Sequence, residues 1–276
     1  MNTLDIPPQI LYDDRCDDQY GLGVPSMKKL SRFAAALLSL VLLPSCSSTA
    51  GGSEREVSIL YVGNSFVYTG NVPRQVRVLA ELYGVDCTYK SVSKGGGSLS
   101  DTMGVAMKAM DQKQYSYVII QDYGTRPGSD GFFADVKALC DKAHAAGAIP
   151  VLYSPAWVNI DAVPDRQGQK GYTDAYREAA SLNGALLVNA GDAWVYAYDA
   201  IEGIDLYKPN DYHANDAGAY LTACVFVGTL FDIHVKEATG KNRYSGELAI
   251  PLGQAAWEFV NYFHQHGCEY DILAGA

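Results

Sequence analysis

The sequence has few charged residues and, among them, few cations. Only 19% of its 276 residues are charged, and 31 acidic residues outnumber 21 Lys and Arg, which gives a net charge of -10. Binding to nucleic acid needs a basic face that neutralises phosphates, and no stretch of this chain supplies one. The composition therefore argues against a nucleic-acid partner, whereas 48% hydrophobic residues indicate a folded globular chain.

Cysteine is also scarce, and its spacing does not suit a metal site. The six cysteines are Cys16, Cys46, Cys87, Cys140, Cys224 and Cys268. None of them forms the closely spaced pairs that zinc or iron–sulfur sites use, so we expect no metal. A disulfide would be compatible with an exported protein, but its pairing does not follow from the sequence.

The chain lacks a hydrophobic run long enough to span a membrane as a helix. An apolar run near the N-terminus extends only from Phe33 to Leu43, which is too short for a span. A basic segment, residues 27–32, precedes this run, and the small-residue ending Pro44-Ser45-Cys46 follows it. This order of basic, apolar and cleavage regions is typical of a secretory signal peptide.

The signal peptide suggests how the N-terminal part is organised. Residues 43–46 resemble a bacterial lipoprotein box, in which the cysteine carries the lipid, so Cys46 is the expected anchor. We predict a non-native extension at 1–26 with the true start at Met27, a lipoprotein signal peptide at 27–46, a flexible tether at 47–55 and one domain at 56–276. The protein would then be exported and held in the bacterial cell envelope, at the outer membrane. The alternative is a buried N-terminal helix of the domain.

Short apolar runs alternate with helical stretches along the rest of the chain, which is typical of a parallel sheet built from βαβ units. No repeat, low-complexity segment or linker divides this region, so we predict a single α/β domain. The expected strands are 57–62, 86–92, 117–121, 149–153 and 185–188. The expected helices are 73–83, 99–110, 132–146, 172–183, 192–200, 217–231 and 252–265, with an irregular loop at 206–214.

A serine stands where the first strand ends. The apolar run from Val57 to Val62 stops at Gly63-Asn64-Ser65, and the carboxyl edge of a parallel sheet is where ligands bind. Ser65 is therefore placed for nucleophilic attack. The alternative is an ordinary turn, because Asn and Ser side chains commonly bond to the backbone in turns.

A candidate base lies in the irregular loop before the late apolar helix. Acyl transfer by a serine needs a base, a group that orients the base, and hydrogen-bond donors for the oxyanion. His213 has Asp211 two residues before it and Asn210 three residues before it. Ser65 and His213 are far apart in the sequence, but both loops can meet at the same edge of the sheet.

These residues resemble the motifs of the SGNH/GDSL hydrolase superfamily. Gly63-Asn64-Ser65-Phe66 is similar to the first block, Gly95-Gly96-Gly97-Ser98-Leu99 to the second, and His213 lies where the last block places its base. The closest resemblance is to a poorly characterised bacterial branch with a Gly-Asn-Ser-Phe first block. It implies a flavodoxin-like three-layer α/β/α sandwich with a five-stranded parallel sheet. It also implies ester hydrolysis without metal or organic cofactor, with Ser65 as nucleophile, His213 as base, and the Ser65 and Gly96 N–H groups as oxyanion donors.

Two positions depart from the pattern of that superfamily. The third block usually supplies an asparagine amide to the oxyanion hole, whereas this strand ends in Gln121-Asp122, so we assign that role to Gln121. The last block places an aspartate three residues before the histidine, where this chain has Asn210. Either Asn210 or Asp211 would then orient the imidazole of His213.

Three further residues lie on loops at the same expected edge. Tyr123, Arg126 and Trp157 are candidate substrate-binding residues, because aromatic rings there would suit sugar rings, although ordinary loop packing explains them equally well. His144, His234, His264 and His266 are interpreted as surface residues.

The function that follows is a serine esterase that removes O-acetyl groups from a small molecule or a glycan. Two alternatives use the same fold. One is a glycan-binding surface lipoprotein that has little or no turnover. The other is an O-acyltransferase that passes the acyl group to another sugar.

Overall fold

The computed structural model describes residues 55–122, 124, 126–156, 165–236 and 246–266. The predicted extension, signal peptide and anchor at Cys46 lie outside these residues and stay predictions. Tyr123 and Trp157 also lie outside them. Within the described part of the chain, no helix is both long and apolar enough to cross a membrane.

The core of the domain is a five-stranded parallel sheet, which confirms the predicted α/β class. The strands lie in the order β2-β1-β3-β4-β5. Their bounds are β1 Arg55–Gly63, β2 Val85–Ser93, β3 Tyr117–Ile120, β4 Ile149–Ser154 and β5 Leu186–Asn189. Because β3 lies on the opposite side of β1 from β2, the order reverses at β1, and the crevice at such a reversal is where open α/β sheets bind ligands.

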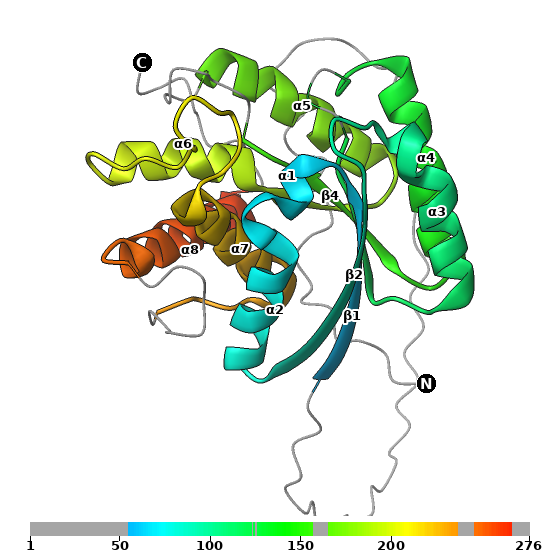
Figure 1. Cartoon of the computed structure of the whole chain (residues 1–276), viewed down its shortest axis with the longest axis horizontal. Helices are drawn as coiled ribbons and strands as arrows, with labels where there is room; N and C mark the ends of the chain where they lie inside the picture. Colours follow the sequence, from blue (N-terminus) through cyan, green and yellow to red (C-terminus); the bar gives the residue numbers. More distant parts are fainter. Residues whose placement is uncertain (1–54, 123, 125, 157–164, 237–245, 267–276) are drawn as a thin grey trace, which may run out of the picture. The chain divides into compact units, whose positions relative to one another are not determined.

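Helices cover both faces of the sheet and form two separate cores (Figure 1). One core packs the sheet against α2, α6, α7 and α8, and the other packs it against α3, α4 and α5. The helices are α1 Ser65–Tyr68, α2 Val72–Leu82, α3 Leu99–Gln112, α4 Asp130–Ala145, α5 Arg166–Leu182, α6 Ala190–Ala200, α7 Asp216–Phe231 and α8 Ala249–His266, with a 3-10 turn η2 at Thr69–Asn71. Helix α7 is buried at every position from Ala217 to Leu230, as its continuous apolar sequence predicts.

Two helices differ from the prediction in informative ways. The segment after Ser65 is not a loop but the single-turn helix α1, which Asn64 caps by accepting the N–H of Phe66. Helix α5 begins six residues before the predicted start at Tyr172, because Asp165 caps it by accepting the N–H of Gly168. The predicted helix begins too late because Gly168 and Gly171 disfavour a helix interior.

The end of β1 is locked to the end of β3. The amide oxygen of Gln121 accepts the backbone N–H of Asn64 at 3.1 Å, and the side chain of Gln121 is fully buried. A Cβ on Gly63 would lie 2.6 Å from that oxygen and 2.8 Å from Val67 Cγ2. Glycine at position 63 therefore makes room for the bond that fixes where Ser65 begins its helix.

A second buried polar group joins β5 to α5 and α6. The carboxylate of Asp192 accepts hydrogen bonds from the Thr173 hydroxyl and the Asn189 amide, both at 2.7 Å. Asp192 is only 2% exposed, and this burial raises its pKa to about 6 in spite of the two hydrogen bonds. The ionised carboxyl is thus less favoured in the folded state than in the unfolded chain.

Gly63→Ala should destabilise the protein by about 1–3 kcal/mol, because the added methyl collides with Gln121 and Val67 in a packed core. Urea unfolding measures the change. Gly104→Ala in α3 is the matched control, since its Cβ would meet no atom within 4 Å and alanine favours a helix. Equal stability of the two variants would contradict the conclusion that Gly63 leaves room for the Gln121 side chain.

The stability of the protein should fall as the pH rises from about 4 to about 6. The folded pKa of Asp192 lies above its unfolded value, so the folded state binds more protons in this window and the contribution is lost as the pH passes the folded pKa. The loss is at most about 3 kcal/mol. Asp192→Asn should remove this part of the slope in unfolding curves recorded across the window, whereas the exposed control Asp141→Asn should keep it. If Asp192→Asn left the slope of the unfolding free energy against pH unchanged, other groups would be the cause of this slope.

Candidate active site

Ser65 lies at the carboxyl end of β1 with its backbone N–H free. Asn64 is the N-cap of α1, and the side chain of Asn64 accepts the N–H of Phe66, while the N–H of Val67 bonds to the Asn64 carbonyl. The N–H of Ser65 has no such acceptor among the described groups. A free N–H in the first turn of a helix is suited to stabilise negative charge, as an oxyanion donor must.

The glycine-rich loop after β2 lies beside Asn64. The N–H of Gly97 bonds to the Lys94 carbonyl at 2.9 Å, and the carbonyl of Gly97 accepts the side-chain amide of Asn64 at 3.2 Å. Gly96, at the tip of this turn, is exposed and has a φ of 63°, which favours glycine. Its N–H bonds to no described group, so Gly96 keeps the donor that the resemblance assigns to it.

Gln121 is in the expected place, but both ends of its amide are engaged. Its oxygen holds the N–H of Asn64, and its nitrogen donates to the carbonyl of Asp122. The amide oxygen thus fixes the turn at Asn64. Because an amide nitrogen carries two N–H groups, the bond to Asp122 does not exclude the predicted role of Gln121 as an oxyanion donor, which stays a prediction.

Asp211 orients the imidazole of His213. One carboxylate oxygen of Asp211 lies 2.7 Å from His213 Nδ1 and 3.2 Å from the backbone N of His213. Partial burial raises the pKa of Asp211, but the hydrogen bonds from His213 outweigh this effect and the net shift is downward. An ionised Asp211 keeps the proton on Nδ1, which leaves a lone pair on Nε2 for use as a base.

Asn210, the other candidate, has a backbone role instead. Residues 208–211 form a tight turn, closed by a 3.1 Å bond from the Asp211 N–H to the Lys208 carbonyl. Asn210 is exposed in the centre of this turn with a φ of 54°, a left-handed conformation that asparagine tolerates. Of the two alternatives, the structure places Asp211 against the histidine.

His213 Nε2 lies close to α1 but is not bonded to Ser65. This nitrogen is buried and has no hydrogen-bond partner. The His213 ring is 5.7 Å from the ring of Phe66, which follows Ser65, and 4.5 Å from the ring of Tyr212. The segments that carry Ser65 and His213 therefore lie against each other, and catalysis by Ser65 would require a bond between its hydroxyl and Nε2 to form when substrate binds. Catalytic hydrogen bonds often tighten only in the substrate complex.

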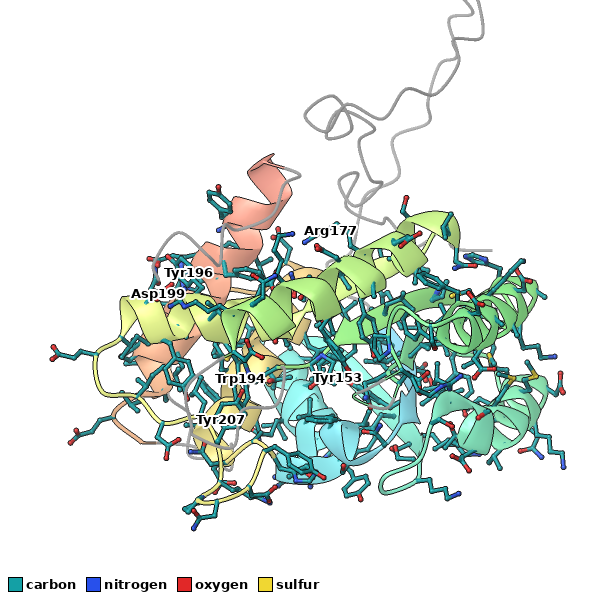
Figure 2. The ribbon with its side chains drawn as sticks, turned by 90° about the horizontal axis from the view of Figure 1, so that it is seen from above. Tyr153, Arg177, Trp194, Tyr196, Asp199 and Tyr207 are labelled. Atoms are coloured by element: carbon teal, nitrogen blue, oxygen red, sulfur yellow. The ribbon has the colours of Figure 1, made fainter. Side chains whose placement is uncertain are left out.

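A small pocket opens beside His213. Its walls come from α1, η2, the end of β4, α6, α7 and the His213 loop, and include Phe66, Tyr153, Trp194, Tyr207 and Thr222. Figure 2 shows Tyr153, Trp194 and Tyr207 close together. Trp194 donates to the Thr222 hydroxyl at 3.0 Å, and its ring is 4.9 Å from that of Tyr207. About 20 Å³ is open to the centre of a water-sized sphere, which is room for a water molecule or a methyl group.

Arg126 is paired with two carboxylates. Its guanidinium donates to Asp122 at 2.9 Å and to Asp135 at 2.8 Å, and the Asp122 side chain is fully buried. Asp122 also accepts the N–H of Leu99 at 2.9 Å. Arg126 thus neutralises the carboxylate that joins β3 to α3, which agrees with the loop-packing alternative, and its predicted role in substrate binding stays a prediction.

The aromatic surroundings of the histidine were not predicted from the sequence. Phe66 and Tyr212 border the imidazole, and their positions next to Ser65 and His213 in the sequence could have indicated this. The pocket residues Tyr153, Trp194 and Thr222 give no comparable signal, because they come from three different elements. Among the residues that the structure describes, no three His, Cys, Asp or Glu side chains could hold a metal ion together.

Comparison with known proteins gives matches in structure alone. No family model matches the chain, and no curated protein matches it in sequence. A candidate SGNH hydrolase from Slackia heliotrinireducens is 23% identical, with a TM-score of 0.53, over 63% of this chain and 99% of that one. A DUF4886 family protein from Bacteroides uniformis is 20% identical, with a TM-score of 0.59, over 75% of this chain and 96% of that one.

A third solved structure is a variant of an acetyl xylan esterase from Geobacillus stearothermophilus. It is 14% identical to this chain, with a TM-score of 0.53, over 66% of this chain and 97% of that one. Identities this low indicate a shared fold and do not transfer an activity. Together with the all-parallel sheet and its strand order, they establish that this chain has the SGNH hydrolase fold.

Proposed function

We propose that the protein is a serine esterase that hydrolyses short acyl esters, held at the bacterial cell envelope by a lipid on Cys46. The observation that carries the proposal is the pair Asp211–His213, with a free Nε2, whose imidazole lies 5.7 Å from the ring of Phe66, the residue after Ser65 at the carboxyl edge of the sheet. A hydroxyl, a base and an orienting carboxylate are the parts that acyl transfer by serine requires.

The first half of the reaction forms an acyl-enzyme. Ser65 Oγ attacks the ester carbonyl while His213 Nε2 takes the hydroxyl proton, and Asp211 stabilises the resulting imidazolium. The N–H groups of Ser65 and Gly96 donate to the developing oxyanion. The carbon–oxygen bond to the leaving alcohol then breaks, and His213 gives this alcohol its proton.

The second half returns the enzyme to its starting state. Water attacks the acyl group on Ser65, His213 takes the proton of the water, and the same N–H groups stabilise the second oxyanion. Ser65 leaves with the proton held by His213, and the free acid is released. Besides the ester and water, each step uses groups of this chain.

The size of the pocket supports a short acyl group. Space for about one methyl group beside His213 suits the acetyl methyl and excludes a long chain. The similarity to structures of acetyl xylan esterases agrees with this choice at the level of the fold.

One observation favours a second candidate, a glycan-binding protein with little or no turnover. His213 Nε2 is shielded by protein and not bonded to Ser65. If this arrangement persisted with ligand bound, the site would bind without reacting. Activity measurements on matched variants decide between the two.

Ser65→Ala should abolish the hydrolysis of p-nitrophenyl acetate, because it removes the nucleophile. Asp211→Ala should lower kcat by about 10²–10⁴-fold, because His213 loses the group that fixes its tautomer. Asn210→Gly is the matched control in the same turn, and it should stay within a few-fold of the wild type, since glycine adopts the left-handed conformation without strain. Equal rates for the wild type and Ser65→Ala would overturn the esterase and favour the binding protein.

The rate should also fall steeply with acyl length. We expect kcat/KM to drop at least tenfold from p-nitrophenyl acetate to p-nitrophenyl octanoate, because the pocket beside His213 cannot hold the longer chain. A series of p-nitrophenyl esters measured with the wild-type protein checks this. A preference for octanoate would contradict the small-acyl assignment.

A further inference from the structure

Two large aromatic side chains beside the candidate site are exposed to solvent. Tyr68 is 48% exposed and Tyr212 is 41% exposed. Tyr212 lines the rim of the pocket and Tyr68 does not line it, and no step of the proposed reaction uses the hydroxyl of either residue. Exposed aromatic side chains at the mouth of a site suggest contact with a ligand rather than packing.

Tyr68 borders the nucleophile on the side of the glycine-rich loop. It lies three residues after Ser65 in α1, so the two side chains are neighbours on this helical turn. A Cβ on Gly95 would lie 2.7 Å from the Tyr68 hydroxyl, which shows that the phenol lies against the loop that carries Gly96. Glycine at position 95 thus leaves room for this ring beside the oxyanion donors.

Tyr212 borders the base on the side of the His213 loop. Its ring centroid is 4.5 Å from that of His213, with an angle of 32° between the planes, and 6.1 Å from that of Phe66. One face of Tyr212 therefore packs towards the site while much of the side chain remains in solvent. Tyr68 and Tyr212 belong to the two segments, α1 and the His213 loop, that supply the nucleophile and the base.

We propose that Tyr68 and Tyr212 are stacking platforms for the sugar rings of a neutral glycan whose ester reaches Ser65. This inference rests on the proposed function and adds the class of substrate and its binding residues. A sugar ring has an apolar face of C–H groups that packs on an aromatic face, and hydroxyls at its rim that stay in water. Two half-exposed tyrosines beside a methyl-sized pocket fit an acetylated sugar chain better than a lipid, whose acyl chain would need a long apolar channel.

The charges near the site favour a neutral chain over an acidic one. The pocket lining contains no Lys, Arg, Asp or Glu. Arg126 is bonded to Asp122 and Asp135, and Lys94 in the glycine-rich loop is paired with Asp101 at 2.6 Å. Lys208, in the loop that carries His213, acts on Asp211 and helps to lower the pKa of that carboxyl, and the net charge of -10 disfavours polyanions in general.

The kinetic test compares an acetylated sugar chain with a small ester. Wild-type protein, Tyr68→Ala, Tyr212→Ala and the ring-retaining Tyr68→Phe and Tyr212→Phe are assayed on acetylated xylo- and manno-oligosaccharides and on p-nitrophenyl acetate. Each alanine variant should lose at least tenfold more kcat/KM on the oligosaccharides than on p-nitrophenyl acetate, mainly through KM, and each phenylalanine variant should lose less than threefold. Tyr89→Ala in β2, an exposed tyrosine remote from Ser65 in the chain, is the control and should not change this ratio. Equal losses on both kinds of substrate would overturn the inference.

A binding test separates this inference from the failure of the esterase. Ser65→Ala protein is titrated with the same oligosaccharides after removal of their acetyl groups, with and without the Tyr68→Ala change. Binding that weakens at least tenfold with Tyr68→Ala supports the stacking role of Tyr68. This holds even if the wild-type protein does not hydrolyse p-nitrophenyl acetate, a result that would reject the proposed esterase activity alone. Binding that is unaffected by Tyr68→Ala, or that is tighter for oligogalacturonates than for the neutral chains, overturns the platform for neutral glycans.

Discussion

The hydrogen bond from the Asn64 backbone N–H to the Gln121 side chain is the contact on which the candidate site depends. It joins the ends of β1 and β3, the two strands between which the strand order reverses. A glycine at position 63 makes room for the Gln121 amide, and Asn64 in turn caps α1 and holds the glycine-rich loop through Gly97. The position of the Ser65 hydroxyl and of its N–H therefore follows from one fully buried amide, whose bonds are strong because water does not compete for them.

Much of the fold could be predicted because the sheet is buried on both faces. Strands such as β3 and β4 are continuous apolar runs bounded by polar residues, and α7 is apolar along its whole length, so their positions follow from hydrophobicity alone. The bounds were less accurate where a cap overrides propensity. Asp165 begins α5 in a stretch that contains two glycines, and Asn64 turns the expected loop after β1 into a helical turn.

The site was harder to predict, because its roles depend on which partners a side chain has already engaged. Spacing alone left Asn210 and Asp211 as alternatives, and only the tight turn at 208–211 decides that Asn210 serves the backbone while Asp211 reaches the imidazole. The surroundings of Arg126 were hard to predict for a similar reason. A cation next to a buried carboxylate is retained by it, since an unpaired buried charge is costly, and Asp122 is fully buried.

The shielded nitrogen of His213 is informative for the same reason. A buried polar atom without a partner costs about 1–3 kcal/mol, and a catalytic role is one of the explanations for such an atom. Nδ1 is bonded to Asp211, so the free acceptor of this ring is Nε2, and the adjacent segment of chain contains Ser65. A bond from the Ser65 hydroxyl would satisfy Nε2 and activate the nucleophile in one movement. Phe66 and Tyr212, which border the imidazole, are the side chains that such a movement would have to accommodate, because Phe66 follows Ser65 and Tyr212 precedes His213.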